Sequence, residues 1–152
     1  MKIEICEKGI YKIFVNKEII KNVDYESRDE IVNCVKDILY KLKLRLGLCG
    51  FYKIKVFPHN KIGIFLEAIK LDDSEYSNSL DLRVVVYMDE RFYFETDDYF
   101  VIKECNDKRY FEGLFYCLVD DNFDPFIAKV EFGKFIYGKD VNKVLNNSII
   151  LW

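Results

Sequence analysis

The sequence predicts an α+β protein made mostly of antiparallel sheet, with one long amphipathic helix and one or two short helices. Phenylalanine and tyrosine, which favour strands, supply 13 and 11 of the 152 residues. Segments in which apolar and polar residues alternate recur along the chain and are separated by turn sequences. Only one long segment, between residues 27 and 47, repeats its apolar residues with helical spacing instead.

The first half is predicted to follow the order β-α-β-β. Alternation indicates a strand over Tyr11–Val15, preceded by a short one around Ile3–Cys6. Ser27 and Glu30 then form a capping box, in which each side chain accepts a hydrogen bond from the other residue's backbone N–H. Gly47 offers the left-handed stop. The apolar stripe between these ends runs through Ile31, Val35, Ile38 and Leu42.

A hairpin is expected to follow the helix, with strands at Phe51–Phe57 and Ile62–Ile69. The helix would cover one face of the resulting sheet. The next segment, 72–79, is rich in Ser, Asp and Asn and has no apolar period, so it is expected to be an exposed connection. Two organisations stay open, namely one compact domain over 1–152 or two halves, 1–71 and 80–152.

The second half is predicted to begin with a hairpin of Leu82–Met88 and Arg91–Glu95 around Asp89-Glu90, followed by a strand over Tyr99–Lys103. We interpret Lys108–Val119 as a helix from its apolar spacing, although its aromatic residues would also suit a strand.

The tail resembles a phosphate-binding loop at first sight. Residues 133–140 read G-K-F-I-Y-G-K-D, with Asp140 where such a loop has Ser or Thr. Phe135, Ile136 and Tyr137, however, continue the alternation of a strand that we predict over Phe126–Tyr137. Gly138 would then make a turn, and Asp140 would cap a short helix over Asp140–Leu145.

Composition bounds the class of partner. The net charge of −3 offers no broad basic surface, so nucleic-acid binding is disfavoured. No apolar run is long enough to span a membrane or resembles a secretory signal, and we expect a cytoplasmic protein. Five cysteines without a closely spaced pair, and the single His59, do not suit a zinc site. We therefore expect reduced, mostly buried thiols, and no metal or cofactor.

The basic residues after the middle of the helix suggest one candidate site. Read functionally, they would form a patch for an acidic partner or a nucleic acid. The simpler interpretation is a solvated face whose cations interact favourably with the C-terminal end of the helix dipole. The candidate residues are Lys36, Lys43, Arg45, Lys53 and Lys55.

An enzyme with dispersed carboxylate chemistry is an alternative prediction. It requires two carboxylates in one cleft, assisted by His59, whose side-chain type titrates near neutral pH. An acidic cluster around residues 120–124 lacks the spacing of a calcium loop and is interpreted as a solvated turn. The carboxylates considered for the cleft are Asp72, Asp73, Asp89, Glu90, Asp120 and Asp124.

Two segments resemble a known family. Met1-Lys2-Ile3-Glu4, followed by a strand, a capped helix and a hairpin, is similar to the N-terminal domain of MecA-type adaptor proteins of low-GC Gram-positive bacteria. Glu131-Phe132-Gly133-Lys134 and Ile136, followed by a short helix, look like the E-Y-G-K-x-I strand and terminal helix of that family's C-terminal domain. The resemblance implies an adaptor that delivers substrates to a Clp-type ATPase.

Together these observations predict a small intracellular, non-enzymatic protein-interaction or adaptor module of a low-GC bacterium or its mobile elements. A protein partner is expected, and a contiguous group of exposed aromatic side chains would mark where it binds. The sequence does not indicate which aromatic residues these are.

Overall fold

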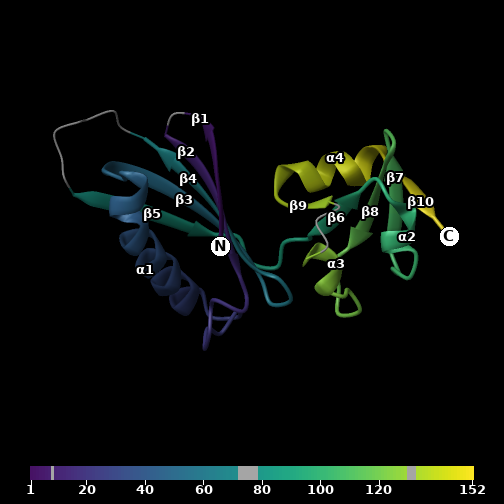
Figure 1. The fold of residues 1–152 in the computed structure, drawn as a ribbon, viewed down its shortest axis with the longest axis horizontal. Coiled ribbons are helices and arrows are strands. Elements are labelled where there is room, and N and C mark those ends of the chain that lie inside the picture. The colour runs from purple at the N-terminus through teal and green to yellow at the C-terminus, as the bar shows by residue number, and fades with distance from the viewer. Residues whose placement is uncertain (8, 72–78, 130–132) are drawn as a thin grey trace. The chain divides into compact units, whose positions relative to one another are not determined.

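The chain forms two compact units, Met1–Met88 and Asp89–Trp152, each built on a five-stranded sheet (Figure 1). The α+β class predicted from the sequence is confirmed. The predicted connection at 72–79 lies, except for Ser79, outside the described residues. The units divide between Met88 and Asp89. The structure, a computed structural model, describes residues 1–7, 9–71, 79–129 and 133–152.

The sheet of the first unit has the strand order β1-β2-β4-β3-β5. Neighbouring strands are antiparallel, except that β5 runs parallel to β3. The strands are β1 (Lys2–Glu7), β2 (Ile10–Asn16), β3 (Gly50–His59), β4 (Gly63–Lys70) and β5 (Leu80–Val86).

One face of this sheet is covered by α1 (Arg28–Leu46), as Figure 1 shows. The helix buries Ile31, Val35, Leu39 and Leu42, which repeat every three or four residues and therefore share one side. They pack on every second residue of the central strands, among them Ile13, Val15, Ile54, Val56, Ile64 and Leu66. The intervening strand residues point to the opposite face of the sheet.

The ends of α1 follow their sequence signals only in part. Glu30 N–H donates to Ser27 Oγ at 3.4 Å, as the capping box requires. The Glu30 carboxylate, in contrast, accepts from Asp24 N–H at 3.0 Å, while Ser27 N–H donates to the Asp24 carbonyl. The reciprocal half of the predicted box is therefore wrong. Gly47 ends the helix in the left-handed region, with φ of 66°.

The second unit has an antiparallel sheet with the strand order β10-β7-β8-β6-β9. On one face, Val141 and Val144 of α4 (Lys139–Asn147) pack against Tyr93, Tyr116 and Ile136. The strands are β6 (Tyr93–Thr96), β7 (Lys108–Phe111), β8 (Leu114–Leu118), β9 (Gly133–Ile136) and β10 (Ile149–Leu151).

Two predictions at the junction of the units are wrong. Leu82–Met88 and Arg91–Glu95 do not form a hairpin, because β5 joins the first sheet and β6 the second. Tyr99–Lys103 is not a strand, since Tyr99–Ile102 forms the short helix α2. Asp98 begins this helix, and its carboxylate accepts from Phe100 N–H at 3.0 Å.

The predicted helix over Lys108–Val119 is also wrong, because this segment forms the β7–β8 hairpin. Glu112 and Gly113 occupy the turn with φ of 49° and 83°. Two consecutive positive φ angles give the turn the twist that a two-residue hairpin prefers. The aromatic residues that made the pattern ambiguous are strand residues here.

The tail departs from one long strand over Phe126–Tyr137. It begins with the short helix α3 (Phe126–Lys129) and resumes as β9 at Gly133, while 130–132 lie outside the described residues. The short helix predicted near residue 140 is confirmed as α4. Its cap is Gly138, however, and Asp140 lies inside the first turn.

Candidate interaction surfaces

The structure does not bring the five predicted basic residues into one patch. Lys36 and Lys43 are seven residues apart and lie on the same side of α1. Arg45 lies about 200° around the helix from Lys43, at about 100° per residue. Only Lys36 and Lys43 therefore share a helix surface.

Lys53 and Lys55 belong to a different surface. They alternate along β3 with Ile54 and Val56, which pack under α1, so both lysines lie on the face opposite the helix. Lys55 there lies directly across from Glu67 of β4, whose other cross-strand neighbour is Lys12. This row of alternating charges fits an ordinary solvated sheet face.

Two apolar side chains beside Lys36 and Lys43 were not predicted from the sequence. Tyr40 and Leu44 are 51% and 94% exposed, although α1 buries its other apolar face against the sheet. Leu44 is about 200° around α1 from the buried Leu42, at about 100° per residue. On a helical wheel, both residues lie far from the apolar stripe, so the sequence does carry the signal for their exposure.

The segment that resembles a phosphate loop is a strand followed by a helix. Phe135 of β9 contacts the rings of Phe94 and Phe123, with centroid distances of 5.4 and 6.1 Å. Ile136 is buried under α4. These positions hold packed side chains of a strand, which supports the interpretation given from the sequence.

His59 and the candidate carboxylates are engaged in local turns. His59 Nδ1 accepts from Lys61 N–H at 3.1 Å. Asp120 and Asp124 each accept from the backbone N–H two residues later, at 3.0 and 2.9 Å. Such bonds shape turns.

The remaining candidate carboxylates are Asp89, Glu90, Asp72 and Asp73. Asp89 and Glu90 are exposed, while Asp72 and Asp73 lie outside the described residues. Within the part of the chain that the structure describes, no three His, Cys, Asp or Glu side chains are grouped closely enough to hold a metal ion.

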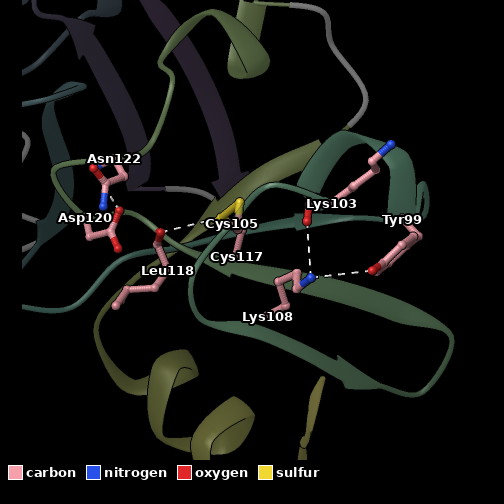
Figure 2. Close-up of a disulfide and its surroundings, with 8 residues drawn as sticks. All are labelled: Tyr99, Lys103, Cys105, Lys108, Cys117, Leu118, Asp120 and Asn122. Atoms are coloured by element: carbon pink, nitrogen blue, oxygen red, sulfur yellow. Dashed lines mark hydrogen bonds between the residues drawn. A yellow bond between two sulfur atoms is a disulfide. The ribbon is translucent and has the colours of Figure 1, made fainter. Parts of the chain in front are cut away.

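The expectation that all cysteines are reduced is wrong, because Cys105 and Cys117 form a disulfide (Figure 2). The two cysteines are 12 residues apart in sequence, so their spacing did not indicate that they would pair. The β7–β8 hairpin places Cys117 directly across from Lys108, only three residues after Cys105. The other three cysteines are thiols, of which Cys6 is exposed and Cys34 and Cys49 are half-buried.

Lys108 adds a second link beside the disulfide. Its Nζ donates to the Lys103 carbonyl at 3.1 Å and to the Tyr99 hydroxyl at 3.5 Å, as Figure 2 shows. The same ammonium lies 5.6 Å from the centroid of the Tyr99 ring. Lys108 and the disulfide together hold α2 and the loop after it against the β7–β8 hairpin.

A connected row of apolar side chains starts at α2 and ends at the sheet edge. The rings of Phe100 and Tyr99, Tyr99 and Phe115, and Phe115 and Tyr110 have centroids 6.3, 5.6 and 5.2 Å apart. Tyr110 lies directly across from Ile149 of β10. We call these five residues the aromatic strip. Phe100 is 80%, Ile149 64% and Tyr110 36% exposed.

The opposite face of the second sheet carries a polar network under α4. Tyr93 OH donates to Asp107 at 3.1 Å, and Arg109 Nε donates to the same carboxylate at 3.1 Å. Arg109 also donates to Ser148 Oγ at 3.4 Å, which ties β7 to the end of α4. Burial, followed by the Asp107 charge, raises the pKa of Tyr93. A tyrosine held neutral in this way acts as a structural donor.

No helix in the described residues is long and apolar enough to cross a membrane. Comparison with known proteins found no matching family model, no matching curated protein and no matching solved structure.

Proposed function

We propose that this chain is a non-enzymatic protein-interaction module whose second unit binds an extended segment of a partner protein along β10. The observation that supports this is the aromatic strip, which joins exposed apolar side chains to a strand at the edge of the sheet. Contiguous exposed apolar surface of this kind marks interaction sites.

The edge supplies backbone hydrogen bonds. β10 pairs with β7 on one side, and no strand among the described residues pairs with its other side. An edge strand presents N–H and C=O groups that can pair with an added strand. Charged or proline residues often guard such edges, but β10 consists of Ile149, Ile150 and Leu151.

The strip supplies the side-chain contacts. Successive residues of a strand point to opposite faces, so every second residue of a partner strand would face Ile149 and Tyr110. Burying a large apolar side chain contributes about 1.5–3 kcal/mol, and aromatic residues often dominate such interfaces. An extended partner with apolar residues at alternate positions fits this surface best.

An adaptor role, which the resemblance to MecA-type proteins implies, is part of this proposal. An adaptor holds two partners at once, so the edge of the second unit would serve one of them. Delivery of that partner to a Clp-type ATPase stays a hypothesis that rests on the resemblance alone.

Affinity capture from cells of the source organism tests the proposal. The tagged chain should retain a partner protein that a double variant, Phe100→Asp with Ile149→Asp, releases, because carboxylates would then lie on the apolar surface. Ile19→Asp is the matched control, since Ile19 is an exposed isoleucine of the first unit.

Hydrogen exchange on the purified complex should show that the partner protects the backbone amides of β10. Equal capture by the wild-type chain and the double variant, or protection confined to other strands, would contradict the proposal.

A further inference from the structure

We propose that the C-terminal half of α1 is a second docking surface, which binds an acidic amphipathic helix of a protein partner. The surface is formed by Lys36, Tyr40, Lys43 and Leu44, which we call the α1 stripe. Tyr40 is three or four residues from each of the other three positions, so all three are its neighbours on one side of the helix. The inference is independent of the β10 edge, because it concerns another unit and another chemistry.

The apolar members of the stripe do not contribute to the core. Leu44 is 94% exposed, and the buried residues of α1 lie on the other side of the helix. Tyr40 is half exposed, and its hydroxyl donates to the carbonyl oxygen of Leu80 at 3.4 Å. This bond to the start of β5 restrains the ring. An aromatic side chain that is already ordered loses less entropy on binding.

The basic charge around Tyr40 and Leu44 favours a partner with a negatively charged surface. On the side of α1 that carries Tyr40 and Leu44, Lys36, Lys41 and Lys43 are basic and Asp37 is acidic, a net charge of +2. The first turn, in contrast, holds Asp29 and Glu30. Cations near the C-terminal end of a helix interact favourably with the helix dipole, which explains the basic side chains. It does not account for an exposed leucine and a restrained tyrosine between the lysines.

The length of the stripe suggests the form of the partner. Lys36 and Leu44 are eight residues apart, which is about 12 Å along the helix axis at about 1.5 Å per residue. Two turns of a second helix cover this length. Its apolar side chains would contact Tyr40 and Leu44, and its carboxylates would approach Lys36 and Lys43. Complementary charge of this kind sets specificity and speeds association.

Selection from a library of displayed helical peptides tests the inference on the full chain. Peptides are selected on the wild-type chain and on Leu44→Glu in parallel. We expect the peptides that the wild-type chain retains and the variant loses to combine apolar residues three or four apart with an excess of Asp and Glu. A selection that gives no such peptides, or gives basic or uncharged ones, overturns the inference.

Affinity measurements with one enriched peptide sharpen the test. Leu44→Ala should weaken its binding about tenfold and Lys36→Glu about fivefold, from the usual worth of a buried leucine and of exposed charge pairs. Ile19→Ala and Lys21→Glu are the matched controls and should leave the affinity within about twofold. Both Ile19 and Lys21 are exposed residues outside α1. Equal losses in variants and controls would overturn the inference.

Two further measurements distinguish the α1 stripe from the β10 edge and from a nucleic-acid site. The Ile149→Asp variant should bind the acidic peptide as the wild-type chain does, so failure of the β10 proposal leaves this test intact. A single-stranded oligonucleotide should not compete with the peptide. If the oligonucleotide displaces the peptide, and the Lys36→Glu variant binds the oligonucleotide more weakly than the wild-type chain does, the stripe is a nucleic-acid surface and the inference is wrong.

Discussion

The two units are held together by different means. Under α1, the fully buried side chains of the first unit are aliphatic except for Tyr52, and Tyr11 and Tyr25 pack against them. Under α4, the second unit packs Tyr93 and Tyr116 with three aliphatic residues. It also buries Phe94 and Phe123, and a disulfide joins Cys105 to Cys117. A small unit buries less apolar surface than a large one, and many small units add a covalent link. The comparison teaches that one chain can combine a mainly aliphatic core with a core that adds aromatic packing and a cross-link.

The largest expected effect comes from the centre of the first core. Leu39 is completely buried between α1 and the sheet. Leu39→Ala should lower the free energy of unfolding by about 3–4 kcal/mol, because it removes buried methyl groups and leaves a cavity. Hydrogen exchange should show the loss in the first unit, and Leu44→Ala on the exposed side of α1 is the control. If both substitutions have the same effect, α1 does not pack as described.

Removing the disulfide is the corresponding test of the second unit. Cys105→Ala, or reduction of the wild-type chain, should lower stability by about 3 kcal/mol, as expected for a link that closes a short loop. The amides of β7, β8 and α2 should exchange faster while those of α1 change little. Cys6→Ala removes an exposed thiol and serves as the control. Unchanged exchange after reduction would show that burial alone holds the second unit.

The difference between the units also explains what the sequence predicted. The helix of the first unit was found because its cap, its apolar period and Gly47 are all local signals. The hairpin after it was found because β3 alternates and a turn connects it to the apolar segment of β4. The parallel pairing of β5 with β3 was missed, since it depends on a contact between distant segments rather than on local alternation.

The second unit was harder to predict because its local patterns are ambiguous. Tyr110, Leu114 and Phe115 fit a helical face as well as a hairpin. The pairing of β7 with β8 through a turn with positive φ at Glu112 and Gly113 distinguishes the two. The β7–β8 hairpin positions Cys117 near Cys105. Predicting a helix there therefore missed both the hairpin and the disulfide. The same holds for the aromatic strip, whose members come from α2, β7, β8 and β10.

Alkaline pH gives a smaller effect that probes the tyrosines of the second core. Burial, with a hydrogen bond to Glu95 as the next cause, raises the pKa of Tyr116 above its ordinary value of 10.0. The unfolded chain then loses this proton at lower pH than the folded chain does. Stability from Tyr116 is therefore complete below pH 10.0 and falls as pH rises above it, by up to about 1.4 kcal/mol per pH unit.

In Tyr116→Phe, the unfolding free energy should therefore fall less steeply with pH above 10.0. The slope should decrease in magnitude by up to about 1.4 kcal/mol per pH unit, which corresponds to one proton. Denaturant titrations at several alkaline pH values measure the slope. Burial also raises the pKa of Tyr52 in the first core, so the stability of the variant should still fall with rising pH, with a smaller negative slope. Tyr110→Phe makes the same change at a more exposed ring and serves as the control. An unchanged slope in Tyr116→Phe would show that Tyr116 does not ionise differently in the two states.

The smallest expected effect concerns the start of α1, where the capping box is only half formed. Ser27→Ala removes the hydroxyl that accepts from Glu30 N–H and should lower stability by about 1 kcal/mol. Glu30→Gln tests the other half. Its amide oxygen can still accept from Asp24 N–H, so this variant should cost less than Ser27→Ala. Because both changes lie at the edge of the first core, exchange should rise in the first turn of α1 and stay constant in β7 and β8. Faster exchange in β7 and β8 after Ser27→Ala would mean that the two units do not differ in the way described, since a local change in one would then reach the interior of the other.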